Sequence, residues 1–264
     1  MTGDGRLARL AWRLGPWLAV GLLVLGWEGA ARSGTVTPFM LPPLTVVLER
    51  IGADAGSGEL LHHLALTLYR ALTGFAIAAA VGIPLGVLIA RQRVVRWLFD
   101  PIISVGFPMP KIAFLPIIVL WLGFQDVSKI SMVALDAVFP VVTATVIGTL
   151  GVERELLWSA RTLGASERRL LWEIVLPAAL PQVLTGLQVA LPIALIVSVV
   201  TEMTMGGLGL GGAMIRASRF ADSPGVFAGI VEIAAAGYGL VKGMALLRRR
   251  LLRWHHEALE PSTV

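Results

Sequence analysis

The chain has 264 residues, of which 56% are hydrophobic and only 15% are charged, and its mean hydropathy is +0.79. A soluble domain usually carries about 25% charged residues, so this composition excludes an ordinary water-soluble globular protein. The chain has no cysteine, which excludes disulfides and thiol chemistry. The net charge of +5 comes from basic residues scattered beside apolar runs rather than from one patch, so we expect no nucleic-acid partner.

Apolar runs long enough to cross a bilayer recur along the sequence. About 20 helical residues cross a hydrocarbon core of roughly 30 Å. In chain order the predicted spans are residues 14–31, 71–90, 101–125, 130–152, 178–201 and 227–247. We therefore expect an all-α integral membrane protein with about six transmembrane helices, which form a single domain over residues 1–264. The first run follows three arginines like a signal peptide, but it is long and lacks a clear cleavage pattern, which favours an uncleaved helix.

The distribution of lysine and arginine predicts the orientation, because these residues concentrate in cytoplasmic loops. When loops are assigned alternately, 15 basic residues fall on the side of both termini and 5 on the other side. Both termini and the loop of residues 153–177 are therefore predicted to be cytoplasmic.

Residues 153–177 have the pattern of two short helices joined by a turn. Gly164 is suited to a helix end that needs a positive φ, and Pro177 marks the entry to the next span. Such an elbow offers a docking surface to another protein. An interfacial helix held by Arg168, Arg169 and Trp172 is the alternative.

This elbow resembles the EAA motif of binding-protein-dependent ABC importer permeases, which is E-A-A, three residues, Gly, nine residues, Ile-x-Leu-Pro. The residues at the motif's spacing are Ala160, Gly164, Ile174, Leu176 and Pro177. Trp158 replaces the motif's Glu and Ser159 its first Ala, which puts in question any polar contact of that Glu. Residues 41–44, 67–86, 116–123 and 202–209 are similar to the nitrate/sulfonate/taurine-type permeases, so the resemblance extends over roughly residues 41–254.

The resemblance implies a type I ABC importer permease in a bacterial inner membrane. Two permease copies, most simply a homodimer, would form one pathway, two cytoplasmic ATPase subunits would bind ATP and Mg, and an external solute-binding protein would deliver the substrate. The implied coupling residues are Ala160, Gly164, Ala165, Ile174, Leu176 and Pro177. The implied substrate is a small anion such as an alkanesulfonate, taurine or nitrate, and a vitamin or pyrimidine precursor is the alternative. We expect no catalytic residue, cofactor or metal in this chain.

Two other classes of protein remain as alternatives. A secondary transporter driven by an ion gradient would favour inverted repeats and paired broken helices, and a membrane enzyme would need clustered His, Asp or Glu residues. The sequence displays neither pattern.

Three ionisable residues in or beside predicted spans are candidates for the pathway or its gate, because an uncompensated charge in a bilayer costs roughly 2.5 kcal/mol or more. They are Lys111, Asp136 and Glu202. Lys111 would suit the path of an anion, whereas Glu202 would suit gating or helix pairing. The alternative is structural: Lys111 or Arg70 pairs with Asp136 or Glu202 only to neutralise charge between helices.

Three further patterns carry weaker expectations. Residues 207–212 satisfy GxGxxG, but they follow a span rather than a strand, so we expect a flexible outward loop instead of a dinucleotide site. Gly74, Ala78, Gly82 and Gly86 recur every fourth residue, which predicts close helix packing. The pairs His62-His63 and His255-His256 lack metal-site spacing, so we expect solvated or headgroup-facing histidines.

Overall fold

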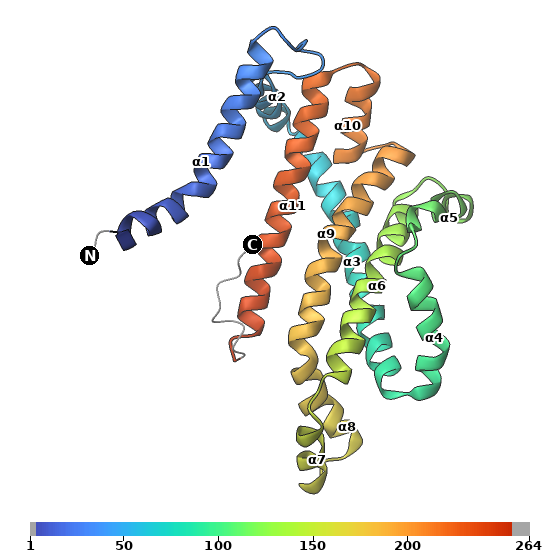
Figure 1. Ribbon diagram of the computed structural model, residues 1–264. Helices are drawn as coiled ribbons and strands as arrows, with labels where there is room; N and C mark the ends of the chain where they lie inside the picture. Colours follow the sequence, from blue (N-terminus) through green and yellow to red (C-terminus); the bar gives the residue numbers. More distant parts are fainter. Residues whose placement is uncertain (1–3, 255–264) are drawn as a thin grey trace. The chain divides into compact units, whose positions relative to one another are not determined.

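The computed structural model describes residues 4–254, and all regular elements in that part of the chain are helical (Figure 1). Side chains of residues 4–14, 16 and 17 are not among those described. In chain order the helices are α1 (Asp4–Arg32), α2 (Leu44–Ser57), α3 (Glu59–Arg91), α4 (Arg93–Gly106), η1 (Lys111–Phe114), α5 (Leu115–Leu122), α6 (Asp126–Leu150), α7 (Arg154–Thr162), α8 (Glu167–Leu170), η2 (Leu171–Val175), α9 (Leu176–Met205), α10 (Leu210–Arg219) and α11 (Ser223–Leu251).

Four helical runs in the described residues are long and apolar enough to cross a membrane: α3, α6, the run Glu167–Met205 that ends with α9, and α11. Together α4 and the η1–α5 run pass the same test, but they bend by 96° and count as a fifth span only if taken as one. The predicted span 101–125 therefore contains a sharp break. Pro108 and Pro110 lie at this break, and proline removes the backbone donor that a continuous helix needs.

The remaining predicted span, residues 14–31, lies within α1. Several of its side chains are outside the described set, so this span stays a prediction.

Contacts within the chain group into two units. The larger unit comprises His63–Gly212 and the residues from Ala234 on, and the smaller unit comprises the residues up to His62 and Ala213–Ile233. The prediction of one membrane domain over the whole chain stays a prediction.

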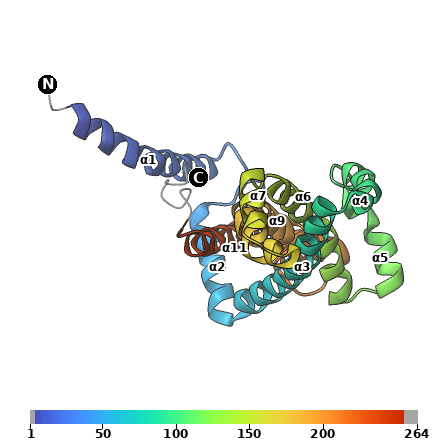
Figure 2. The same cartoon turned by 90° about the horizontal axis from the view of Figure 1, so that it is seen from below.

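The core of the larger unit lies where α6 packs against α9 and α3, as Figures 1 and 2 both show. Its buried residues include Met132, Val133 and Val141 of α6 and Ala190 and Ala194 of α9. Small side chains let these helices approach closely. A Cβ on Gly186 of α9, for instance, would stand only 2.4 Å from the Cβ of Ala144 on α6.

The stripe of small residues on α3 packs against α6, which confirms the predicted close contact. Its members are Gly74, Ala78, Gly82 and Gly86, and all four are buried. A Cβ added at Gly74 would lie 2.5 Å from Val133 Cγ1, and one added at Gly86 would lie 2.6 Å from Thr145 Cβ. Helices in lipid associate largely through such packing, because lipid tails are as apolar as the helix surfaces.

In the smaller unit, side chains near the end of α1 hold the start of α2. The Trp27 indole donates to Pro42 O at 2.9 Å, and the Leu44 N–H at the first turn of α2 donates to Glu28 Oε2 at 2.7 Å. A carboxylate at a helix N-terminus is favourable because unpaired N–H groups point toward it. Arg50 of α2 pairs with Asp222 at 2.8 Å.

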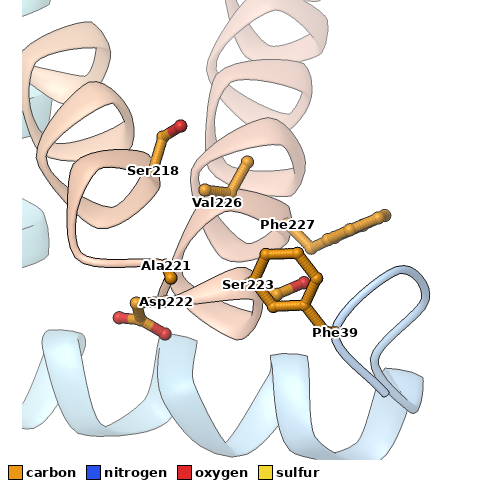
Figure 3. Close-up of a pocket in the computed structure, with 7 residues that line it drawn as sticks. All are labelled: Phe39, Ser218, Ala221, Asp222, Ser223, Val226 and Phe227. Atoms are coloured by element: carbon orange, nitrogen blue, oxygen red, sulfur yellow. The ribbon is translucent and has the colours of Figure 1, made fainter. Parts of the chain in front are cut away.

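The smaller unit also contains a shallow hollow of about 200 Å³ (Figure 3). It is lined by Phe39, Ser218, Ala221, Asp222, Ser223, Val226 and Phe227.

Gly86→Ala tests the packing of α3 on α6. We expect it to lower the free energy of unfolding by about 1–3 kcal/mol, because the new methyl group overpacks a contact that includes backbone atoms. Gly243→Ala in α11 is the matched control, since its Cβ would meet nothing within 4 Å. Helix propensity alone predicts a gain of up to about 1 kcal/mol for this control. Thermal unfolding of the two purified variants in detergent measures their stability. Equal changes in stability for the two variants would contradict the packing interpretation.

Candidate functional site

The elbow of residues 153–177 has the predicted helix–turn–helix form. α7 ends in a turn where Gly164 has φ +84°, which confirms the expected positive-φ glycine. The Gly164 N–H donates to Arg161 O at 2.9 Å and the Ala165 N–H to Ala160 O at 3.0 Å. These are the two hydrogen bonds of a Schellman motif, which satisfies the last carbonyls of a helix. Ser166 then caps α8 by accepting from the Arg169 N–H.

The second half of the elbow joins α9 through a wider, π-helical turn, η2. Ile174 lies within this turn, and Leu176 and Pro177 begin α9. Pro177 has no N–H to offer the preceding turn, and a local widening accommodates that missing donor. The proline of the motif therefore shapes the link by which the elbow enters α9, a helix of 30 residues.

Ion pairs tie the elbow together and to α3. Glu167 accepts from Arg161 of α7 at 3.0 Å and from Arg91 at the end of α3 at 2.7 Å. Both pairs are largely exposed, and pairs of this kind contribute about 0–1 kcal/mol each. They orient the turn more than they stabilise the fold.

Large apolar side chains project from the elbow. Leu163 is 87% exposed and Trp158, the residue in place of the motif's Glu, is 60% exposed, while Ala160 is buried. Trp172 is exposed as well. An apolar group of this size on an exposed turn is typical of a contact surface for a partner or a membrane. The coupling role of the elbow residues stays a prediction.

Two of the three predicted pathway residues lie against each other. Lys111 of η1 is buried, and its Nζ lies 3.1 Å from Asp136 Oδ1 of α6. The same nitrogen donates to Phe107 O at 3.0 Å and lies 4.7 Å from the ring centroid of Phe139. This contact is the charge-neutralising pair that the sequence left open, and a role in the pathway stays a prediction.

The third residue, Glu202 near the end of α9, is fully buried in a charge cluster. The cluster comprises Thr67, Arg70, Asp126, Lys129 and Glu202. Arg70 Nη1 lies 2.7 Å from Glu202 Oε1 and Arg70 Nη2 lies 2.8 Å from Asp126 Oδ1, so one guanidinium joins α3 to α9 and to α6. The Thr67 hydroxyl donates to the Glu202 carboxylate at 2.9 Å.

Sequence reasoning considered Arg70 and Glu202 as a pair but missed Thr67, Asp126 and Lys129 as their neighbours. A signal was available, because Thr67 and Arg70 are three residues apart on one helix face. Asp126 and Lys129 have the same spacing at the start of α6. The spacing does not specify which helix faces meet, because that depends on tertiary packing.

The glycine segment, Gly206–Gly211, lies directly on the cluster. Lys129 Nζ donates to Gly206 O at 3.1 Å and Arg70 Nη1 to Leu208 O at 2.6 Å. In the other direction, the Gly209 N–H donates to His63 Nδ1 at 3.1 Å and the Gly211 N–H to Glu202 Oε2 at 3.1 Å. Most residues of the segment are therefore held by hydrogen bonds, and the flexibility and outward position expected of this loop stay predictions.

The expectation for His63 is wrong. Its side chain is buried and accepts the Gly209 N–H, so it is neither solvated nor facing headgroups. The sequence could not show this because the partner is a backbone group about 146 positions away. His255 and His256 lie outside the described residues. Within the described residues, no group of three or more His, Cys, Asp or Glu side chains is placed to hold a metal.

Comparison with known proteins identifies the family. Residues 82–253 match the family described as binding-protein-dependent transport system inner membrane component. The chain is 34% identical to the taurine transport system permease protein of Escherichia coli, over 94% of this chain and 95% of that protein. It is also 34% identical to a putative aliphatic sulfonates transport permease protein of Bacillus subtilis, over 94% and 90% of the two chains. Identity to the formylaminopyrimidine transport permease protein of Halalkalibacterium halodurans is 33%, over 91% and 96%.

The fold has a counterpart among solved structures. An amino acid ABC transporter chain aligns with a TM-score of 0.59 at 18% identity, and the alignment covers 75% of this chain and 97% of that one. This likeness confirms the predicted permease fold. These comparisons agree: the family match, the near full-length relatives and the fold all indicate a permease. As a permease, the chain is the non-catalytic membrane subunit of its transporter. The chain belongs to the family of binding-protein-dependent inner-membrane transport components, the permeases of ABC importers.

Proposed function

We propose that two copies of this chain form the pathway of an ATP-driven importer for a small organosulfonate such as taurine or an alkanesulfonate. The similarity to permeases named for taurine and for aliphatic sulfonates, over about nine-tenths of each chain, carries the proposal. Family membership implies a binding protein that delivers the solute and an ATPase that drives the cycle. Two cytoplasmic ATPase subunits would hold ATP and Mg, and both termini of this chain would lie on their side of the inner membrane.

The elbow of residues 153–177 is the proposed attachment point of the ATPase. Its Schellman turn and Ser166 cap fix its shape, while Leu163 and Trp158 project outward. Because the elbow continues into α9, a displacement of the elbow would be transmitted along that helix. Thirty residues at a rise of 1.5 Å give α9 a length of about 45 Å, enough to carry motion through the bilayer.

A pyrimidine precursor is the second candidate substrate, and the 33% identity to the formylaminopyrimidine permease favours it. The relatives give no specific support to nitrate. Lys111 stays the proposed contact for an anion, but its ion pair with Asp136 means that a bound anion would compete with a carboxylate 3.1 Å away. The sulfonate group of taurine or an alkanesulfonate would meet that competition, whereas a neutral pyrimidine would not.

Uptake into sealed vesicles tests the substrate and the energy source. With the ATPase and binding protein present, we expect labelled taurine or an alkanesulfonate to accumulate only when ATP is supplied, and a protonophore to have no effect. Accumulation of formylaminopyrimidine instead would support the second candidate. Uptake driven by an ion gradient without the ATPase would overturn the importer proposal.

Leu163→Asp tests the elbow. We expect it to weaken co-purification of the ATPase about tenfold, because a charge would replace an apolar anchor at the centre of the contact. Phe220→Asp is the matched control, since Phe220 is 83% exposed but lies on the opposite side of the membrane in the proposed orientation. Its ATPase recovery should stay unchanged. If Phe220→Asp loses the ATPase while Leu163→Asp retains it, the proposed orientation of the chain in the membrane is reversed.

A further inference from the structure

The glycine segment, Gly206–Gly211, comprises the turn after α9 and the first two residues of α10, and its backbone makes many hydrogen bonds to side chains of other helices. Three consecutive N–H groups donate to three different side chains: Gly209 to His63, Leu210 to Thr67 Oγ1 at 2.9 Å and Gly211 to Glu202. Two carbonyls accept from Lys129 and Arg70. The partners come from α3, α6 and α9, so the segment is attached to three helices at once.

Steric fit adds a second constraint on the segment. A Cβ on Gly209, where φ is +126°, would stand 2.3 Å from the Glu202 carboxyl carbon, and one on Gly211 would stand 2.3 Å from Val199 O. Glycine is required at 209 by its positive φ and by the nearby Glu202 carboxylate, and at 211 by the close approach to the α9 backbone at Val199. Glycine here serves close approach.

From these observations we propose that Glu202 is a positioning residue that keeps the glycine segment docked throughout the transport cycle. The segment is then a fixed joint that holds the ends of α3, α6 and α9 together, rather than a gate that opens. This differs from the gating role considered for Glu202 on sequence grounds.

Burial explains why the docked state would persist. Glu202 and Thr67 are fully buried, and lifting the segment would remove an N–H donor from each. A buried charged group that loses a partner is strongly destabilised. Arg70 would keep Asp126 but would lose the Leu208 carbonyl. Moving the helices apart at this joint would therefore require more free energy than moving them elsewhere during transport.

Hydrogen–deuterium exchange of the assembled transporter tests the proposal. The amides of Gly209, Leu210 and Gly211 should exchange at least about 100-fold more slowly than in an unstructured peptide, because each is hydrogen-bonded in a buried site. We expect the same protection at rest and during ATP turnover with the binding protein present. Loss of protection specifically during turnover would show that the segment opens, which would overturn the proposal.

Variants separate the role of Glu202 from general stability. Glu202→Gln should speed exchange in the segment about tenfold or more, since it weakens hydrogen bonds to a charged acceptor. Exchange in the α6 core around Ala137 should not change, whereas a merely structural defect would speed both. Glu59→Gln, at an exposed acid, is the matched control and should change neither.

A second pair of variants covers the case in which Glu202→Gln does not fold. Thr67→Ser keeps the hydroxyl and should retain protection of the Leu210 amide, whereas Thr67→Val removes the acceptor and should lose it. Equal exchange in the two would refute the proposed docking. The measurement at rest needs no substrate, so its outcome is independent of whether the organosulfonate proposal holds.

Discussion

Close packing between α6 and its two neighbours is the constraint on which the larger unit depends. Lipid provides no hydrophobic drive to bring helices together, so the contact must come from van der Waals packing and buried polar bonds. Glycines on α3 and α9 supply the packing by letting backbone approach side chains of α6 to distances at which no Cβ would fit. The same approach brings the polar side chains of three helices within hydrogen-bonding distance of one another.

Charges in this packed unit are compensated locally. Arg70 lies between Glu202 and Asp126, and Lys111 lies beside Asp136, so these two buried cations each have a carboxylate within about 3 Å. Lys129 joins the first cluster and donates to the backbone of the glycine segment. Because isolated charges are costly in a bilayer, these pairs account for ionisable residues in otherwise apolar helices.

The two ends of α9 differ in a way that suits a transporter subunit. At its start, the elbow presents exposed apolar side chains on a turn whose shape is fixed by backbone bonds. At its end, the glycine segment is docked on a buried charge cluster. One end therefore exposes apolar side chains on a well-defined turn, and the other is hydrogen-bonded to buried side chains of its own unit.

The sequence by itself determined the all-helical membrane character, the elbow with its positive-φ glycine, and the small-residue stripe of α3, because these depend on local composition and spacing. It also indicated the family, through motifs that lie in order along the chain. The break near Pro108 and Pro110 was only partly predictable, since prolines show where a helix can bend but not by how much. Only the tertiary structure decided that Lys111 pairs with Asp136, that Arg70 joins Glu202 to Asp126, and that His63 accepts from Gly209. Those contacts join residues far apart in the chain, and their geometry is set by how closely the helices pack.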